Sequence, residues 1–371
     1  MGPTLAVFPM TFNGWNQGGN ARSQNRILRS STKAAPGSRR TQKMAERGGC
    51  TLIQWPDKLK VTAGLLALVL QNACTCEAPR RVRMGAIRSA GCSTLSLAVQ
   101  QKFFEQQNMQ VDLTFMTWAD AQAGAKKNKF DVFCSNLAEL VLLPADYRIV
   151  AIPSYSNGAD VLIARKDAGV DLNGLKGARI GVPPMSMGEL LLTQALMQSA
   201  LVREDFTVLP EEAAELRESI QKSEIQMAVA APPQAFEILQ NPEMQVIFQS
   251  SAMPGDIIDT VAVSAIFMQK HPDMATQLDN VWRDTAHFIE HNPSEAINFL
   301  AQASALPVAT LQRDYKFLTR TEQAAYHQQG GRLFSLIDQL QAIFLQAGSL
   351  KIKRETSQFL AFPPQGSESD P

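Results

Sequence analysis

The stretch YSNGADVLIARKD, residues 155–167, follows directly on YRIVAIPS, residues 147–154, so a polar, turn-forming segment separates two apolar runs that favour strands. Gly158 can adopt a positive φ, and Asn157 and Asp160 can hydrogen-bond to neighbouring backbone groups. A tight hairpin needs only about two to five loop residues, and here each flank has an apolar run of its own. We therefore interpret the stretch as a crossover between two lobes of the protein.

Strand-like and helix-like runs alternate on both sides of this crossover, which is typical of an α/β protein with parallel sheets. Before it, strands are expected at residues 81–87, 110–118, 130–135 and 148–154, and helices at 93–108 and 137–143. After it, strands are expected within residues 175–184, 206–210, 225–233 and 244–251, and helices at 188–201, 211–223 and 233–240. Beyond residue 267 the sequence favours helices up to about residue 347. The pattern predicts two successive α/β units of similar size.

Composition places the chain among globular proteins. Its 371 residues suffice for about two domains, and 45% of them are hydrophobic and 19% charged. Residues 1–60 carry ten Lys or Arg and two acidic residues, which leaves 25 basic and 33 acidic residues in the remainder. Because the chain after residue 60 carries this excess of acidic residues, it is a poor nucleic-acid binder, and we expect no nucleic-acid partner.

The first part of the chain has the composition of a targeting segment. Residues 1–43 are rich in Gly, Ser, Asn, Arg and Gln, which predicts disorder or a start assigned too early, with Met44 as the initiator. Residues 44–76 contain a basic flank, the apolar run VTAGLLALVL and small residues, which is typical of an export signal. The run is too short to span a bilayer, and a buried helix start is the alternative.

Cys74 is a candidate for lipidation. It follows Ala73, as the acylated Cys of a bacterial lipoprotein signal follows a small residue. The third residue before it is Gln71, where such signals usually carry Leu. A free periplasmic form and a membrane-anchored lipoprotein therefore both stay open.

Five segments together resemble a known family. They are FFEQQNMQVDL (residues 103–113), YSNGADVLIARK (155–166), LNGLKGARIGV (172–182), MPGDIIDTVAVSAIFMQKHPD (253–273) and NPSEAINFLAQ (292–302). In this order they resemble the solute-binding proteins of bacterial importers for sulfonates, nitrate, bicarbonate, taurine and thiamine precursors. A thiamine-pyrimidine synthase belongs to the same family.

The resemblance implies a two-lobed, periplasmic-binding-protein-like clamp in which each lobe is a doubly wound sheet. Lobe 1 would comprise residues 80–157 and 260–347, with the C-terminal helices, and lobe 2 residues 160–258; residues 355–371 would be a disordered tail. YSNGAD and GDIIDTVAV (255–263) would be the two crossovers, which absorb hinge closure. The implied protein is a monomer without a cofactor. It captures a small polar or anionic solute and delivers it to the membrane permease of an ABC importer.

Ligands of open α/β sheets lie beyond the carboxyl ends of the strands, and two patterns there predict a polar site. Residues 136–139 and 186–189 both fit a capping box, and the helix starts would present N–H groups with partial positive charge. Each pattern is equally an ordinary helix start. An anion or polar oxygen would contact the following residues: Arg88, Ser135, Asn136, Ser186, Met187 and Gly188.

Aromatic and acidic residues form a second candidate group. Trp118 and Tyr155 are placed to wall a pocket, although Trp118 fits core packing as well. Asp160 and Asp259 lie in the two crossovers and are candidates to hold a ligand amine, with Asn157 beside them. Asp259 would equally bond to local backbone groups.

Other chemistries have little support in the sequence. Phosphate-binding glycine motifs and G-x-S-x-G are absent. His287 and His291 have metal-ligand spacing, but no acid or Cys motif completes a set, so we expect neither a metal nor an enzyme. A synthase would need a cysteine-rich motif that the chain lacks, and a ligand-sensing protein without a transporter is the remaining alternative.

Cys92 and Cys134 follow the first and third strands. In a sheet of order 2-1-3 these strands are neighbours, so the two thiols are expected near each other. A disulfide and two buried thiols both stay open.

Overall fold

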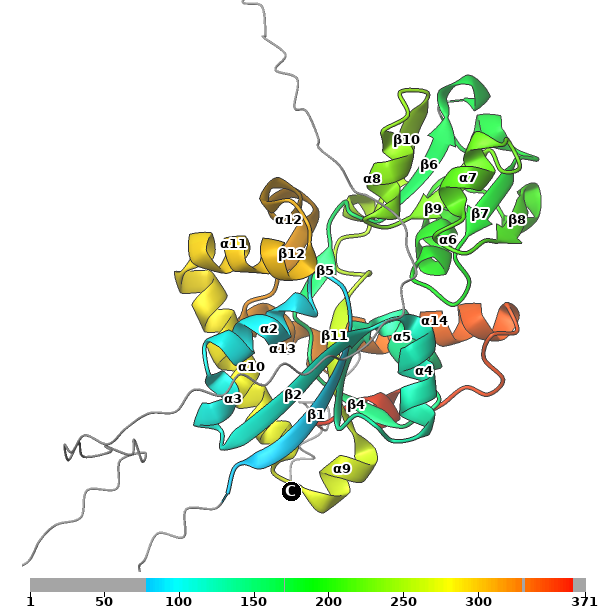
Figure 1. Ribbon diagram of the computed structural model, residues 1–371. Coiled ribbons are helices and arrows are strands. Elements are labelled where there is room, and N and C mark those ends of the chain that lie inside the picture. The colour runs from blue at the N-terminus through cyan, green and yellow to red at the C-terminus, as the bar shows by residue number, and fades with distance from the viewer. Residues whose placement is uncertain (1–77, 170, 329–330, 363–371) are drawn as a thin grey trace, which may run out of the picture. The chain divides into compact units, whose positions relative to one another are not determined.

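The computed structural model describes residues 78–169, 171–328 and 331–362 (Figure 1). Within these ranges the chain forms two five-stranded sheets and one two-stranded sheet, with helices packed around them. The predicted α/β fold with two sheets is confirmed. The predictions for residues 1–43 and 44–76, with Cys74, fall outside the described residues.

The first sheet has the strand order β2-β1-β3-β11-β4. Its strands are β1 (Arg80–Ile87), β2 (Met109–Met116), β3 (Val132–Asn136), β4 (Tyr147–Ala151) and β11 (Asp259–Ser264). β1 is parallel to β2 and β3, which confirms the predicted 2-1-3 order. β11 is antiparallel to both neighbours, because the returning chain enters the sheet at the edge where β3 ends. The sheet is therefore mixed, whereas the alternation of strands and helices favours parallel strands.

Short helices connect the strands of the first sheet. They are α2 (Ser93–Gln100), α3 (Phe103–Gln106), α4 (Trp118–Lys126), α5 (Leu137–Leu142) and α9 (Ala265–Lys270). The single helix expected at 93–108 is two helices, because Lys102 adopts a left-handed conformation with φ 60°. The apolar residues Leu95, Leu97 and Ala98 nevertheless face the core, as their spacing predicts.

The second sheet has the order β10-β6-β9-β7-β8. Its elements are β6 (Val161–Arg165), β7 (Arg179–Val182), α6 (Gly188–Gln198), β8 (Thr207–Pro210), α7 (Leu216–Gln221), β9 (Met227–Ala230), α8 (Gln234–Leu239) and β10 (Met244–Gln249). β7 is parallel to β8 and β9, whereas β6 is antiparallel to β9 and β10. Short 3-10 turns cover Lys166–Ala168, Asn173–Leu175, Arg203–Asp205 and Ser250–Ala252.

The polar stretch after β4 connects the two sheets. β4 belongs to the first sheet and β6 to the second, so the interpretation as a crossover is confirmed. Between them, β5 (Ser154–Ser156) pairs with β12 (Tyr315–Phe317). Tyr155 also bridges to Ile258 of the returning segment. Gly158 makes the turn with φ 130°, which a side chain would disfavour.

The C-terminal part is helical, with α10 (Met274–His291), α11 (Pro293–Ser304), α12 (Val308–Asp314), α13 (Arg320–His327) and α14 (Arg332–Gln346). A final 3-10 turn covers Thr356–Phe359. Phe359 is 1% exposed, Leu360 bridges to Ile149 of β4, and the Arg354 guanidinium lies 4.0 Å from the centre of the Phe359 ring. The predicted disorder of residues 355–371 is therefore wrong for residues 355–362, because burial of these apolar side chains holds the segment on the sheet.

A disulfide joins Cys92, just before α2, to Cys134 of β3, with 5.6 Å between the two Cα atoms. Both residues are fully buried. Of the two alternatives that the sequence leaves open, the structure has the disulfide.

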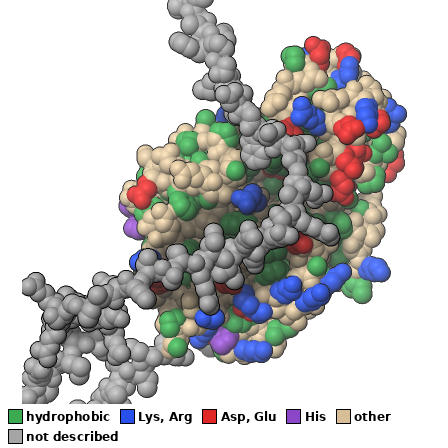
Figure 2. Space-filling view, in the orientation of Figure 1, with side chains coloured by type: hydrophobic (Ala, Val, Ile, Leu, Met, Phe, Trp, Pro, Cys, Tyr) green, Lys and Arg blue, Asp and Glu red, His purple; other side chains and the backbone are tan. Residues whose placement is uncertain are grey.

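The face of the molecule seen in Figure 2 carries charges of both signs. Acidic side chains gather over the helices of the second sheet, and Lys and Arg side chains lie along the edge near α4. Among the described residues, no helix combines the length and the apolar character that crossing a membrane requires.

Candidate functional site at the crossover

Asp259 is the centre of a hydrogen-bond network at the carboxyl edge of the first sheet. It begins β11 opposite Asn136, the last residue of β3. Its Oδ1 accepts a hydrogen bond from Ser89 Oγ, and its Oδ2 accepts from Ser154 Oγ and from the backbone N–H of Gly91, each at 3.0 Å. Asp259 therefore joins the loop after β1, the crossover strand β5 and the return strand β11.

Gly91 leaves room for this carboxylate. A Cβ atom at position 91 would lie 2.5 Å from Ser154 Oγ and would also overlap the Asp259 carboxyl group. Any larger residue would displace one of the two partners. The local sequence SAGCS, residues 89–93, is thus small because the network is compact.

Two further carboxyl groups interact electrostatically with Asp259. Burial raises the pKa of Glu139 to about 8, and the charge of Asp259 adds to the rise, against the hydrogen bonds from Asn136. Burial raises the pKa of Asp160 to about 6; the bond with Ser156 opposes this and the charge of Asp259 adds to it. Burial likewise raises the pKa of Asp259 itself, against its three hydrogen bonds. We call Glu139, Asp160 and Asp259 the crossover carboxyl cluster.

Tyr315, the first residue of β12, is the fourth titratable member of this region. Burial raises the pKa of its hydroxyl well above the ordinary value, and the charges of Asp160, Asp259 and Asp314 add to the rise. The hydroxyl therefore stays protonated at neutral pH and keeps a donor available beside the carboxyl groups.

The crossover carboxyl cluster offers oxygen atoms that can accept hydrogen bonds from a ligand. No Lys or Arg in the described ranges pairs with Glu139, Asp160 or Asp259; the bonds to these carboxyl groups come from Ser, Asn and backbone groups. Glu139 and Asp160 keep partial exposure to solvent. Raised pKa values mean that ionisation here is costly, and a bound cation or a set of N–H donors would lower that cost.

The lobe 2 part of the predicted anion site has a different structure. The capping box expected at Ser186 is wrong: α6 begins at Gly188, and Glu189 instead pairs with Arg203 at 2.7 Å. Ser186 Oγ donates to the carbonyl of Pro183 at 2.6 Å and accepts from the N–H of Gly188 at 3.1 Å. Met187 is 3% exposed, so its side chain belongs to the core. The Ser186 hydroxyl and the N–H of Gly188 therefore already have hydrogen-bond partners within this loop.

The other capping box is confirmed. Asn136 caps α5 by accepting from the N–H of Glu139 at 2.9 Å, and Glu139 accepts from the N–H of Asn136 at 3.3 Å. Ser135 is fully buried and donates to the carbonyl of Asn136. Asn136 therefore positions Glu139, whereas Ser135 is part of the sheet.

Arg88 and Trp118 lie at the ends of β1 and β2, apart from the carboxyl cluster in their contacts. The exposed Arg88 guanidinium lies 5.4 Å from the centre of the Phe115 ring. Trp118 starts α4, packs against buried apolar residues, and has a buried indole N–H without a partner among the described residues. Ligand contact by either residue stays a prediction.

Tyr155 and Asn157 form part of the crossover backbone. Tyr155 pairs with Lys316 of β12, and the N–H of Asn157 donates to the carbonyl of Asp314 at 2.7 Å. Both residues are partly exposed. They set the course of the chain between Ser154 and Asp160.

Sequence reasoning found Asp160 and Asp259 but missed several of their neighbours. These are Ser89, Gly91, Glu139, Ser154 and Tyr315. The small-residue run after the first strand was a usable signal for Ser89 and Gly91. No local pattern marks Tyr315, which approaches through the pairing of β12 with β5.

The described ranges contain no group of three or more His, Cys, Asp or Glu side chains arranged to hold an ion. His287 and His291 lie with ring centres 3.9 Å apart on α10. The Nδ1 of His291 is hydrogen-bonded to the carbonyl of His287, so the pair is engaged within its own helix.

Residues 91–296 match the family model described as NMT1/THI5 like. The chain belongs to the NMT1/THI5-like family. This confirms the resemblance on which the two-lobed expectation rests. A search of curated proteins found no match.

Solved structures with the same fold include three binding proteins. The sulfonate-binding protein SsuA of Methylobacillus flagellatus has a TM-score of 0.65 and 16% identity over 77% of this chain and 92% of its own. The aliphatic sulphonate-binding protein SsuA of Escherichia coli has a TM-score of 0.60 and 14% identity over 76% and 97%. The nitrate-binding protein NrtA of Synechocystis has a TM-score of 0.56 and 10% identity over 77% and 86%. At such identities the likeness shows the fold.

Proposed function

We propose that this NMT1/THI5-like chain is an exported solute-binding protein, which captures a small solute at the crossover and delivers it to the permease of an ABC importer. Three observations support the proposal: the family match, the fold shared with periplasmic binding proteins, and the polar network at the crossover. Crossover segments absorb the φ/ψ changes of hinge closure, so a ligand held there is coupled to closure.

The crossover carboxyl cluster supports a nitrogen-rich solute of the thiamine-precursor class rather than a sulfonate, nitrate or bicarbonate. The cluster offers an anion no paired Lys or Arg, and each of its carboxyl groups that is ionised would repel an anion. An aminopyrimidine offers an amino group and a protonatable ring nitrogen side by side, which a carboxylate binds through two parallel hydrogen bonds. This is the observation that carries the proposed class.

A binding panel tests the class. Thermal unfolding and calorimetric titration would compare the aminopyrimidine precursor of thiamine with taurine, nitrate and bicarbonate. A ligand at 100 times its dissociation constant stabilises the protein by about 2.7 kcal/mol, so true binding is readily visible. We expect stabilisation by the aminopyrimidine alone. Binding of taurine or nitrate instead would overturn the class, and no binding by any of the four would contradict the solute-binding role.

Variants assign the binding to the cluster. Asp160→Asn removes a charge with little change of shape, and we expect it to weaken aminopyrimidine binding by about tenfold or more, as for loss of a charge-assisted hydrogen bond. Asp112→Asn, on the exposed edge strand β2, is the matched control and should bind normally. Equal affinity of the two variants would exclude Asp160 from the site.

A further inference from the structure

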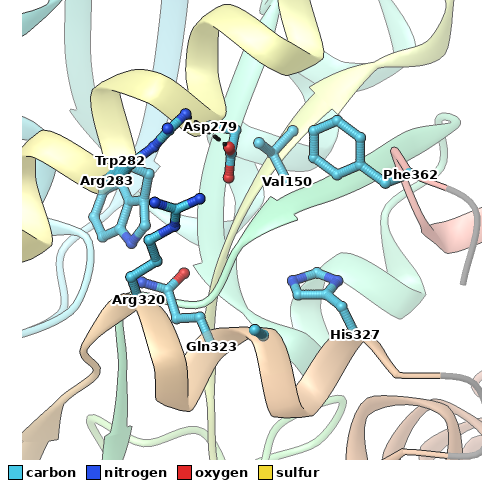
Figure 3. A pocket seen from close by; sticks show the side chains of 9 residues that line it. Val150, Asp279, Trp282, Arg283, Arg320, Gln323, His327 and Phe362 are labelled. Atoms are coloured by element: carbon cyan, nitrogen blue, oxygen red, sulfur yellow. Dashed lines mark hydrogen bonds and ion pairs between the residues drawn. The ribbon is translucent and has the colours of Figure 1, made fainter. Parts of the chain in front are cut away.

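A cavity of about 230 Å³ lies between α10 and α13, outside the crossover network. Asp279, Trp282 and Arg283 line it from α10, and Arg320 and His327 from α13 (Figure 3). None of these residues belongs to the crossover carboxyl cluster or contacts it through a hydrogen bond. The cavity is therefore a separate feature of the fold.

Several residues that line this cavity have buried polar atoms without hydrogen-bond partners. Among the described residues, four buried side-chain nitrogen or oxygen atoms have no hydrogen-bond partner, and three of them belong to cavity residues: Trp282 Nε1, Arg283 Nε and His327 Nε2. Trp282 is only 5% exposed, so its indole N–H has no access to bulk water. The indole N–H of Trp282 and the Nε–H of Arg283 are donors, and each unpaired buried donor costs about 1–3 kcal/mol, which an acceptor inside the cavity would relieve.

The charge of the lining favours an anion. Arg283 and Arg320 contribute two guanidinium groups against one carboxylate, Asp279, which lies 3.5 Å from Arg283. Arg320 forms no ion pair within the ranges that the structure describes, and Figure 3 shows its guanidinium between Trp282 and Asp279. Burial lowers the pKa of His327, so a neutral imidazole completes the lining.

One part of the wall is apolar. Val150 of β4 and Phe362, together with the indole ring of Trp282, line the cavity beside the donors (Figure 3). An inorganic ion would leave this surface unfilled, whereas an organic molecule with one anionic group would cover it.

We propose that this cavity is a second ligand site, which binds a small organic carboxylate through Trp282, Arg283 and Arg320 and packs its apolar body against Val150 and Phe362. A carboxylate has two acceptor oxygens in one plane, and the arginine fork matches that geometry. Occupancy would satisfy the donors that the protein alone leaves unpaired.

The test uses the indole N–H resonances of the full-length, ¹⁵N-labelled protein, with the Trp282 signal assigned through Trp282→Phe. Sodium benzoate is the probe, titrated at constant ionic strength. We expect a saturable shift of the Trp282 signal. Arg320→Met, at an exposed position that tolerates substitution, should weaken the affinity about tenfold or more. Arg217→Met, which removes an exposed arginine from α7, is the charge control and should bind like the parent chain.

Three results would overturn the proposal. The first is that benzoate does not shift the Trp282 signal, which would mean that water alone fills the cavity. The second is that Arg320→Met binds benzoate as tightly as Arg217→Met does, which would mean that benzoate binds outside this cavity. The third is that inorganic phosphate binds as tightly as benzoate. Phosphate has no apolar body, so this result would mean that Val150 and Phe362 do not contribute to binding.

Discussion

At the scale of single residues, Gly91 is where one methyl group would disturb the whole Asp259 network. In Gly91→Ala the new Cβ would lie 2.5 Å from Ser154 Oγ and overlap the Asp259 carboxyl group. We expect the free energy of unfolding to fall by about 1–3 kcal/mol, as for overpacking of a core, and solute affinity to fall with it. Urea denaturation and calorimetric titration measure the two effects.

Gly174→Ala is the matched control for this substitution. There the nearest atom to an added Cβ is Asp171 Oδ1 at 3.6 Å, an ordinary contact. Equal stability of the two variants would show that the loop after β1 adapts and that Gly91 does not constrain Asp259.

Glu139 carries a prediction about pH. Its pKa in the folded protein, about 8, lies above its ordinary value of 4.5, so the folded state holds a proton that the unfolded chain releases. Stability is therefore lost as pH rises between these two values. Glu139→Gln cannot ionise, yet it keeps an oxygen to accept from the N–H of Asn136. We expect the variant to match the parent chain near about pH 5 and to exceed it by a few kcal/mol near about pH 8.5.

Urea denaturation at the two pH values gives the measurement. Asp112→Asn, which removes an exposed carboxylate from β2, should show no such pH-dependent gain. A Glu139→Gln variant that loses stability at the higher pH would mean that the ionised carboxylate is favourable in the fold, contrary to the burial argument.

At the scale of elements, the disulfide ties the start of α2 to β3 across 42 residues of chain. Closing a loop of that length stabilises the folded state by about 4 kcal/mol in the chain-entropy model. We expect a reductant to lower the free energy of unfolding by roughly that amount. Equilibrium urea denaturation with and without dithiothreitol measures it. The double variant Cys92→Ala, Cys134→Ala should be insensitive to the reductant, and an equal response of both proteins would exclude the disulfide.

Ser250, in the 3-10 turn that precedes the return crossover, links this turn to the first crossover through its side chain. Its hydroxyl is fully buried, lies 2.8 Å from Ser156 Oγ and accepts from the N–H of Gly158 at 2.7 Å. Ser250→Ala leaves both groups without this partner, so we expect a loss of about 1–3 kcal/mol in unfolding free energy. Ser251→Ala is the neighbouring control, at a partly exposed position. If the two variants unfold at the same urea concentration, the link contributes nothing.

At the scale of the whole molecule, the proposed function requires export, and the prediction concerns its first step. We expect the chain, expressed with its own N-terminal segment in a bacterium, to lose the residues before Cys74. Intact mass measures the cleavage. A lipid adduct that disappears in Cys74→Ala would identify the anchored form, and an unmodified mass would identify the free one. A periplasmic protein that retains residues 1–70 would contradict the assignment of the signal.

The sequence by itself determined the alternation of strands and helices, the change of sheet at residues 155–167 and the capping box at Asn136. Each of these depends on the backbone period or on groups a few residues apart, so a local pattern carries it. The same locality explains the error at Ser186, where Pro183 and Arg203 compete for the groups that a capping box would use.

Only the tertiary structure decided that Asp259 interacts electrostatically with Glu139, Asp160 and Tyr315, and that residues of α10 and α13 line one cavity. These residues are far apart in the chain and meet through the pairing of β11 with β3 and of β12 with β5. Their pKa values depend on burial, which no window of sequence contains. A site made of distant, desolvated groups exists only once the sheets have formed.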